Sequence, residues 1–375
     1  MRIAYVLTTL GIGGAERQAL ALAERIAARG HAVALIVLGP PVPEEWPSVL
    51  PVVHLSMRKS PAGLLITLAS TRKFLAGFRP DLIHSHTFHA NIFARLLKVL
   101  APSQAVSVSA PPQVVSTVHN VYEGPWPRML AYRLTDRLSR RTMCVSQAVA
   151  DRYIRLKAVP AAKCFVLPNG IDTVEFAPSP ARRETMRSEL SAHSDFIWLT
   201  AGRLSPSKDY PNLLRAFALV HAQAPNARLL IAGQATVAQL SAMQALTAEL
   251  GLQESVRWLG LRRDLPALLD AADAFVLASA WEGMPLAAAE AMAMQKPLVA
   301  TSAGGTRELV AECGTIVPPQ NPQALADAML AAMHSTADAR SALGRAARQR
   351  ILESFSIDAR VPEWETLYLS LTSSS

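Results

Sequence analysis

The sequence predicts an α/β fold made of two domains, and three observations support this prediction. Short apolar runs of strand length alternate with longer segments of helix formers, which is the pattern of parallel sheets covered by helices. The chain has 375 residues, enough for two domains of ordinary size. A charged stretch with prolines, residues 172–194, separates the first series of runs from the second and reads as a linker with a leading helix.

The chain opens as a strand, a glycine-rich loop and a helix, at Ile3–Leu7, Gly11–Glu16 and Arg17–Arg29. Such a βαβ opening can bind a dinucleotide, but Glu16 stands where the third glycine of that fingerprint belongs. The next strand, His31–Leu38, also ends without an acidic residue to hold a ribose. Dinucleotide binding therefore fits badly.

Two further strands of the first half end in histidines. Asp81–His86 ends in a histidine pair, and Val114–Asn120 has His119 at its carboxyl end. Ligands of open α/β sheets collect at the carboxyl ends of strands, so His119 is a candidate site residue. No carboxylates at suitable spacing accompany these histidines, so no metal site is predicted. Before both strands, residues 61–78 form an apolar stripe that fits a core-facing helix or a membrane-surface helix.

The second half begins with the strand Phe196–Thr200 and a loop that holds Arg203 and Lys208. Two cations five residues apart on a loop can converge on a diphosphate, with arginine as a fork and lysine as a point charge. Because both lie on a loop, their replacement is expected to change the rate and leave folding nearly unaltered. Further strands are predicted at Ala227–Ala232 and Val256–Gly260.

A pair of glutamates follows the buried strand Ala274–Leu277. Glu282 falls in the loop after this strand, and Glu290 lies more than one turn into a helix that starts near Pro285. The free N–H groups at the start of a helix favour an anion. This arrangement suits a nucleotide sugar, with the diphosphate at the helix end, the sugar near Glu282 and the ribose near Glu290.

These motifs resemble the retaining glycosyltransferases of family 4, which have the GT-B fold. The resemblance implies two Rossmann-like domains with a deep interdomain cleft, and a C-terminal helix, marked by Trp364 and Tyr368, that crosses back to the first domain. It implies domains at 1–172 (acceptor side) and 173–355 (nucleotide-sugar binding), with the crossover helix and tail at 356–375. The catalytic residues implied are His119, Arg203, Lys208 and Glu282. The donor-binding residues implied are Gly13, Gly14, Arg203, Lys208, Glu282, Gly283, Met284, Pro285, Leu286 and Glu290, and the acceptor-side residues are Glu16, Trp126 and Arg128.

The implied function is retaining transfer of a sugar from a UDP- or GDP-type sugar to an acceptor. A lipid-linked saccharide in cell-surface polysaccharide synthesis is the expected acceptor. No Asp-x-Asp motif occurs, which agrees with an enzyme that needs no metal or other cofactor. Two alternatives stay open: a GT-B-like nucleotide-sugar epimerase and a non-catalytic nucleotide-binding module. The presence of both glutamates together with Arg203, Lys208 and His119 argues against a decayed site.

Charge is distributed unevenly. Residues 1–172 hold 20 lysines and arginines against 9 acidic residues, whereas residues 173–375 hold 17 against 20. This excess predicts an anionic partner for the first half, such as the inner face of a membrane, and nucleic acid ranks last because no nucleic-acid-binding motif occurs. Arg133, Arg137 and Arg141 are expected to share a helix face. The predicted membrane patch comprises Trp126, Arg128, Arg133, Arg137, Arg140 and Arg141.

The cysteines and the apolar runs indicate a cytoplasmic protein. Cys144, Cys164 and Cys313 show neither disulfide nor metal-ligand spacing, which favours a reducing compartment. No apolar run approaches the ~20 residues of a membrane span. The N-terminal run, Ile3–Leu10, is too short for a signal peptide and leads into glycines. A peripheral position at the membrane is therefore expected.

Overall fold

A computed structural model describes residues 1–43, 45–58, 60–99, 112–192 and 194–373. The chain forms two compact units. Unit 1 consists of Met1–Gly170 and Ile357–Ser375, and unit 2 of Ile171–Ser356. The final helix therefore belongs to the first unit, and the chain passes between the units twice.

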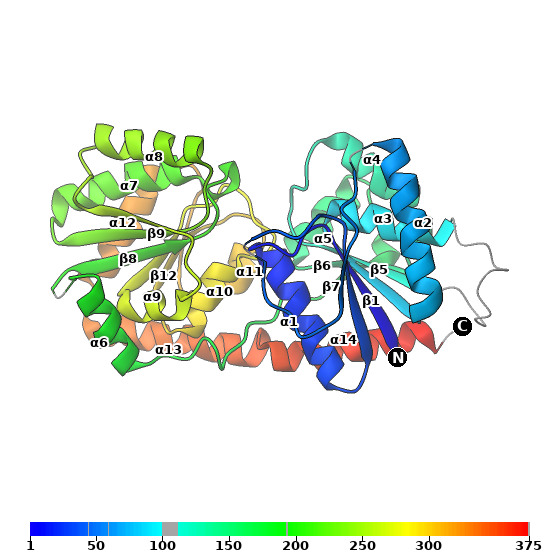
Figure 1. Ribbon diagram of the computed structural model, residues 1–375. Helices are drawn as coiled ribbons and strands as arrows, with labels where there is room; N and C mark the ends of the chain where they lie inside the picture. The colour runs from blue at the N-terminus through cyan, green and yellow to red at the C-terminus, as the bar shows by residue number, and fades with distance from the viewer. Residues whose placement is uncertain (44, 59, 100–111, 193, 374–375) are drawn as a thin grey trace. The chain divides into compact units, whose positions relative to one another are not determined.

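Unit 1 has a seven-stranded sheet in which every pair of neighbouring strands is parallel. The strand order is β3-β2-β1-β4-β5-β6-β7. Figure 1 shows the sheet with helices on both of its faces. The strands are β1 (Arg2–Leu7), β2 (Ala32–Val37), β3 (Val52–His54), β4 (Leu82–His86), β5 (Gln113–Val118), β6 (Arg141–Cys144) and β7 (Cys164–Val166).

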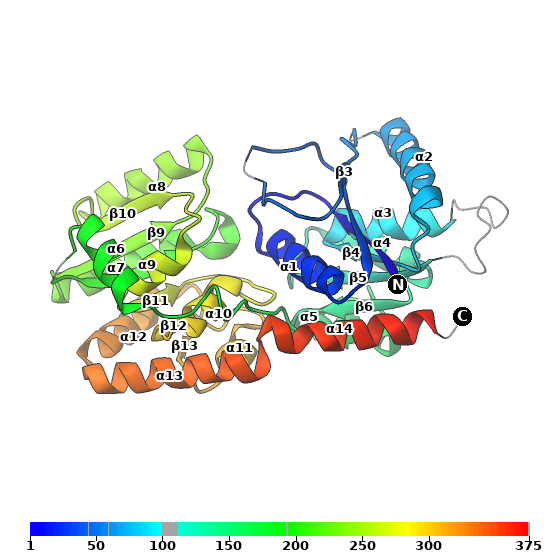
Figure 2. The same ribbon diagram turned by 60° about the horizontal axis from the view of Figure 1, so that its bottom comes forward.

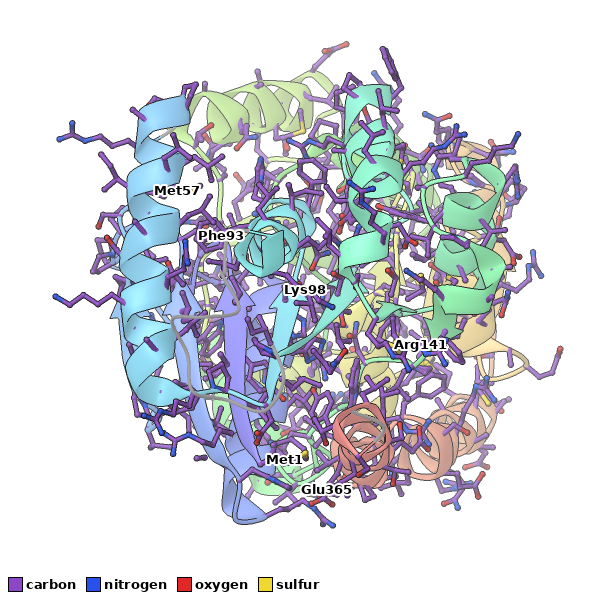
Figure 3. All side chains as sticks on the ribbon, turned by 90° about the vertical axis from the view of Figure 1, so that its right-hand side faces the viewer. Met1, Met57, Phe93, Lys98, Arg141 and Glu365 are labelled. Atoms are coloured by element: carbon purple, nitrogen blue, oxygen red, sulfur yellow. The ribbon has the colours of Figure 1, made fainter. Side chains whose placement is uncertain are left out.

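Two hydrophobic cores lie on opposite faces of this sheet, because successive side chains of a strand point to opposite sides. Ile3 and Tyr5 of β1 pack with α1 (Gly14–Ala28) and α14 (Ile357–Thr372), which Figure 2 shows on one side of the sheet. Ala4 and Val6 pack against the other layer, which includes Phe93 (Figure 3). The remaining helical segments are α2 (Pro61–Phe78), α3 (Phe88–Val99), α4 (Trp126–Thr135), η1 (Asp136–Leu138), α5 (Gln147–Arg155) and η2 (Ala161–Lys163).

Unit 2 has a six-stranded parallel sheet with the order β10-β9-β8-β11-β12-β13. Its strands are β8 (Phe196–Ala201), β9 (Ala227–Ala232), β10 (Val256–Gly260), β11 (Ala274–Leu277), β12 (Leu298–Thr301) and β13 (Thr315–Val317). Its helical segments are α6 (Pro180–Glu189), η3 (Pro206–Lys208), α7 (Tyr210–Gln223), α8 (Val237–Glu249), α9 (Leu265–Ala271), α10 (Leu286–Ala293), α11 (Thr306–Val310), α12 (Pro322–His334) and α13 (Ala337–Ser354).

Each sheet has a point at which the strand order reverses direction. In unit 1 this point lies between β1 and β4, and in unit 2 between β8 and β11. Ligands of open parallel sheets bind outside the carboxyl ends of the strands at such a point. The loops that follow these four strands are therefore where each unit is built to hold a ligand.

The predicted start of α1 is wrong by three residues, and that of α10 differs by one. α1 begins at Gly14, so Gly14 and Glu16 lie in its first turn and not in the preceding loop. Gly13 is the N-cap, and a Cβ there would come within 1.9 Å of Glu16 Oε2, so a larger residue would displace this carboxylate. Pro285 is the N-cap of α10, and Leu286 is the first helical residue.

The predicted helix face of Arg133, Arg137 and Arg141 is wrong. α4 ends at Thr135, Arg137 lies in η1, and Arg141 begins strand β6. The apolar run after Arg141 pairs with β5 in the interior of the sheet, and this pairing overrides the helical spacing of the arginines. Arg141 donates to the carbonyl of Ala162 at 2.8 Å, so it is tied to the fold (Figure 3).

Two of the cysteines, Cys144 and Cys164, lie close together in space although they are 20 residues apart in the sequence. β6 and β7 are neighbours, and the Sγ atoms of Cys144 and Cys164 lie 3.5 Å apart as free thiols. Cys144 is buried and Cys164 is half-buried. Pairing of two strands by tertiary structure, which no spacing rule reveals, brings these two side chains together.

Candidate active site

The loop after β8 is shaped by a close approach of two backbones. A Cβ on Gly233, at the end of β9, would lie 1.8 Å from the carbonyl oxygen of Gly202. Tyr210 donates its hydroxyl hydrogen to the same carbonyl at 2.7 Å. The backbone N–H of Ala280 donates to the carbonyl of Ser207 at 2.8 Å, which joins this loop to the one after β11. A backbone hydrogen bond therefore holds the loops after β8 and β11 against each other.

Lys208 and Glu282 form an ion pair across these two loops. Lys208 Nζ donates to Glu282 Oε1 at 2.5 Å, and Ser279 Oγ donates to the same oxygen at 2.7 Å. The side chain of Glu282 is 9% exposed and that of Lys208 is 21% exposed. A buried carboxylate needs such partners, since an unpaired charge there is costly. Ser279 was not predicted from the sequence, and its place in the Ser-x-x-Glu spacing is the only signal for it.

Arg203 lies on the same loop as Lys208 but is not paired with Glu282. Its side chain is exposed. Among the residues that the structure describes it has no carboxylate or other hydrogen-bond partner. The guanidinium is therefore available for a ligand without first breaking an ion pair.

The helix α10 presents its start to the same region. Within the described part of the chain no side chain caps this helix, so its first N–H groups remain available to an anion. Met284, just before it, is buried, and the carbonyl of Gly283 accepts from the N–H of Gly305 at 3.1 Å. Glu290 lies on α10 and is 6% exposed. Lys208 and Glu282 thus meet at the switch point of unit 2, with Arg203 on the same loop as Lys208 and Glu290 on the helix that follows Glu282.

His119 lies directly after β5, at the carboxyl edge of the sheet of unit 1. Its Nε2 is 2.9 Å from Nδ1 of His86, which ends the neighbouring strand β4. Burial lowers the pKa of His119 to about 4 and places the pKa of His86 well below the ordinary histidine value. Both rings are therefore neutral at pH 7.

Glu123 is a site residue that the sequence analysis missed. Its Oε1 accepts from the backbone N–H of His119 at 3.3 Å, and its Oε2 accepts from the hydroxyl of Tyr132 at 2.8 Å. Burial raises the pKa of Glu123 to about 7. Its position four residues after His119 is the only local signal. Through this hydrogen bond Glu123 holds the backbone of His119 in place.

The predicted acceptor-side residues are placed in different ways. Glu16 Oε1 accepts from the Thr9 hydroxyl at 3.0 Å, beside the β1 switch point. Trp126 is 73% exposed at the start of α4. Arg128 donates to the backbone carbonyl of Glu123, and its guanidinium lies 4.8 Å from the centroid of the Phe88 ring. Arg128 therefore stabilises the segment after His119.

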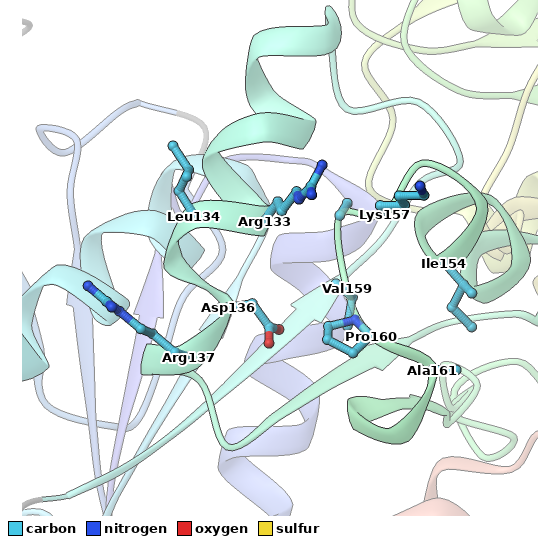
Figure 4. Close-up of a pocket in the computed structure, with 10 residues that line it drawn as sticks. Arg133, Leu134, Asp136, Arg137, Ile154, Lys157, Val159, Pro160 and Ala161 are labelled. Carbon is cyan, nitrogen blue, oxygen red and sulfur yellow. The ribbon is translucent and has the colours of Figure 1, made fainter.

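Three basic residues of the first unit line a cavity of about 640 Å³ (Figure 4). Arg133 and Arg137 come from α4 and η1, and Lys157 follows α5. In Figure 4 the side chain of Arg137 extends away from the other lining residues. Asp136 also lines the cavity, and its Oδ2 lies 3.1 Å from Lys163 Nζ. The cavity lies near the starts of β6 and β7, away from the carboxyl ends of the strands.

The residues of the described ranges contain neither a metal-ligand cluster nor a helix fit to span a membrane. Among these residues no group of three or more histidines, cysteines, aspartates and glutamates is arranged to hold a metal ion. None of the helices in the same ranges combines the length and the apolar character that a membrane crossing requires.

Comparisons with known proteins match both units. The family described as Glycosyltransferase Family 4 matches residues 12–175, and Glycosyl transferases group 1 matches residues 181–350. D-inositol 3-phosphate glycosyltransferase of Corynebacterium urealyticum is 31% identical over 325 residues, 81% of this chain and 74% of the relative. UDP-Gal:alpha-D-GlcNAc-diphosphoundecaprenol alpha-1,3-galactosyltransferase of Escherichia coli is 26% identical over 325 residues, 81% of this chain and 79% of the relative. The crystal structure of Anabaena HepE with UDP and glucose has a TM-score of 0.85 at 23% identity, covering 98% of this chain and 99% of that one.

Proposed function

The chain belongs to glycosyltransferase family 4 and has the GT-B fold, and we propose that it moves a hexose with retention from a nucleotide-diphosphate sugar to a lipid-linked saccharide. The donor is of the UDP or GDP type. The observation that supports this most strongly is the set of groups at the switch point of unit 2. Lys208, Glu282 and the uncapped start of α10 lie there beside the exposed Arg203.

The ion pair between Lys208 and Glu282 suggests how a donor is received. A diphosphate between Arg203 and the start of α10 would attract Lys208 away from Glu282. Glu282 would then accept a hydrogen bond from a hydroxyl of the donor sugar, while Ser279 still holds its carboxylate. Glu290, buried on the same helix, is proposed to accept from the ribose hydroxyls. Donor binding would thus exchange one ion pair for another.

The chemical step needs stabilisation of the leaving diphosphate. Arg203, Lys208 and the helix N–H groups supply positive charge where negative charge develops, which is usually the largest single contribution to such a reaction. In front-face transfer the departing β-phosphate oxygen takes the proton of the acceptor hydroxyl, so no separate protein base is required. Gly13 and Gly14 are proposed to let the chain approach the transferred sugar, and His119 to contact it.

The proposed acceptor follows from the first unit and from one relative. The name of the E. coli relative describes a diphosphoundecaprenol-linked acceptor. In this chain Trp126, Leu130 and Leu134 are 73%, 40% and 67% exposed and lie four residues apart on α4. The exposed Arg133 and Arg137 lie beside them. An apolar stripe next to arginines suits the surface of an anionic membrane, where such an acceptor resides.

A donor screen tests the proposed function. The protein is incubated with UDP- and GDP-sugars, with and without membrane lipid extract, and release of nucleoside diphosphate is measured. We expect release that increases strongly when the extract is present. A changed sugar without any acceptor would indicate an epimerase, and binding without turnover would indicate a nucleotide-binding module. The Arg203→Ala variant is the matched control, because it lacks the exposed guanidinium proposed to bind the diphosphate.

Vesicle sedimentation tests the membrane contact. We expect binding to anionic vesicles, weaker binding to neutral ones, and loss of binding at high salt. Replacing Arg133, Arg137 and Arg140 with alanine should abolish sedimentation and spare hydrolysis of the donor. A matched control replaces three exposed arginines of unit 2, namely Arg215, Arg263 and Arg345. Equal binding to neutral and anionic vesicles would contradict the membrane contact and favour a freely diffusing acceptor.

A further inference from the structure

We propose that His86 is a positioning residue that sets the tautomer of His119, so that His119 presents an Nδ1–H donor. The assignment of the tautomer depends on the unliganded first unit alone. Its consequence for the sugar rests on the function proposed above.

The two rings are held against each other by the sheet. β4 and β5 are parallel neighbours, with His86 opposite Thr117, and His119 follows two residues later. The ring centroids of His86 and His119 are 5.2 Å apart, and His86 Nδ1 lies 2.9 Å from His119 Nε2. On its other sides the His86 ring stacks on the Tyr5 ring, with 5.9 Å between the centroids, and contacts the His84 ring, with 4.1 Å between the centroids. His86 therefore has little freedom to rotate.

One hydrogen lies between these two nitrogens. Burial keeps the pKa of both rings below neutrality, so each ring carries a single hydrogen at pH 7. Either His119 donates from Nε2, or His86 donates from Nδ1. In a neutral imidazole the hydrogen bond made by one nitrogen decides which nitrogen carries the hydrogen.

The second nitrogen of His86 distinguishes these arrangements. His86 Nε2 is buried and has no hydrogen-bond partner among the residues for which the structure gives positions. If His119 were the donor, the hydrogen of His86 would sit on Nε2 as a buried N–H without an acceptor. If His86 donates from Nδ1, its Nε2 is only an unused lone pair. Buried N–H groups without partners are rarer than acceptors with unused capacity, so His86 is the donor.

The consequence is a defined donor at the carboxyl edge of the sheet. His119 accepts at Nε2, so its one hydrogen is on Nδ1. A histidine side chain in water favours the other tautomer, with hydrogen on Nε2, so His86 reverses the ordinary preference. In the proposed enzyme the Nδ1–H would donate to an oxygen of the transferred sugar. A ring in the other tautomer would present only a lone pair there and could not donate to that oxygen.

The tautomer can be measured in the unliganded protein. Histidine labelled with ¹⁵N gives ring nitrogen shifts that separate N–H from bare nitrogen, and the His119→Gln variant identifies the His119 signals. At pH 7 we expect a protonated Nδ1 and an unprotonated Nε2. A protonated Nε2 with a bare Nδ1 would overturn the proposal. This result does not depend on any activity.

Two variants of His86 test its positioning role. His86→Phe keeps an aromatic ring in the stack and removes the donor, so His119 should shift to the Nε2–H tautomer and turnover should fall about tenfold, the value of one hydrogen bond. His86→Asn keeps an N–H near the position of Nδ1 and should restore both readouts. The remote His334→Phe change is the matched control. Equal losses in His86→Phe and His86→Asn with an unchanged His119 tautomer would overturn the role of His86.

The two proposals can fail separately. If His86→Phe does not fold, the spectrum of the unaltered chain and the His86→Asn variant still decide the tautomer. A wild-type spectrum with Nδ1–H, together with no turnover of any nucleotide sugar, would contradict the proposed function and leave the tautomer assignment intact.

Discussion

Replacing Lys208 with alanine should lower both turnover and stability, whereas replacing Arg203 should lower turnover alone. A loop position by itself predicts little effect on folding for either residue. The structure changes that expectation for Lys208, because its Nζ lies 2.5 Å from Glu282 Oε1. Arg203 is exposed and has no such partner among the described residues.

The size of the stability effect follows from the burial of the pair. Breaking a fully buried ion pair costs about 3–5 kcal/mol, because the remaining charge is left unpaired. An exposed pair contributes about 1 kcal/mol or less. With side chains 21% and 9% exposed, the pair lies between these limits. We expect a loss of about 2 kcal/mol for Lys208→Ala, and a change within about 0.5 kcal/mol for Arg203→Ala. Each change should reduce the rate about 10²-fold or more.

Urea unfolding and donor turnover at saturating donor measure the two effects. The double variant Lys208→Met, Glu282→Gln removes both charges, so it should regain most of the stability without regaining turnover. If Lys208→Ala is as stable as Arg203→Ala, the ion pair does not hold these loops together. If Arg203→Ala and Lys208→Ala combined still turn over at a near-native rate, neither stabilises the leaving group.

Three further predictions concern carboxylates. Glu290→Gln should raise the donor KM with little change in kcat, because the ribose is held alike in ground and transition states. Glu282→Gln should mainly lower kcat, and the reverse pattern in steady-state kinetics would show that the two roles are exchanged. Burial raises the pKa of Glu123 to about 7, from the usual 4.5. This raised pKa favours the folded state at low pH, and the contribution is lost as pH rises through about 7. Between pH 5 and pH 8 the free energy of unfolding of Glu123→Gln should therefore rise by about 2 kcal/mol relative to that of the wild type. Parallel urea titrations measure this gain, and an unchanged difference between the two proteins would show that Glu123 does not titrate in that range.

The elements of the fold were predictable where local pattern and tertiary structure agree. The strands Ala227–Ala232, Val256–Gly260 and Ala274–Leu277 match the predicted limits. For Ala227–Ala232 and Ala274–Leu277 the reason is that buried parallel strands read as short apolar runs. The helix from residue 61 to 78 also matches, with Ser60 as its cap. Local pattern failed at Arg141, where pairing with β5 replaced helical spacing.

The candidate site was predictable as a set of residues and not as a set of contacts. A loop after a strand and a helix start are the local signals that make Arg203, Lys208, Glu282 and Glu290 candidates for ligand binding. Nothing in the sequence indicates that Lys208 pairs with Glu282, which is 74 residues away. The same holds for His86 with His119, 33 residues apart. Such pairs depend on strand order, which no spacing in one sequence encodes.

The configuration of the newly formed glycosidic bond tests the proposed function most directly. A nucleotide sugar that the protein accepts is turned over in the presence of lipid extract, and the proton coupling of the anomeric carbon is read by NMR in the product. If Arg203 and Lys208 stabilise the leaving diphosphate as proposed, without a separate base, the product keeps the anomeric configuration of the donor. An inverted product would contradict front-face transfer and require a base that this account does not include.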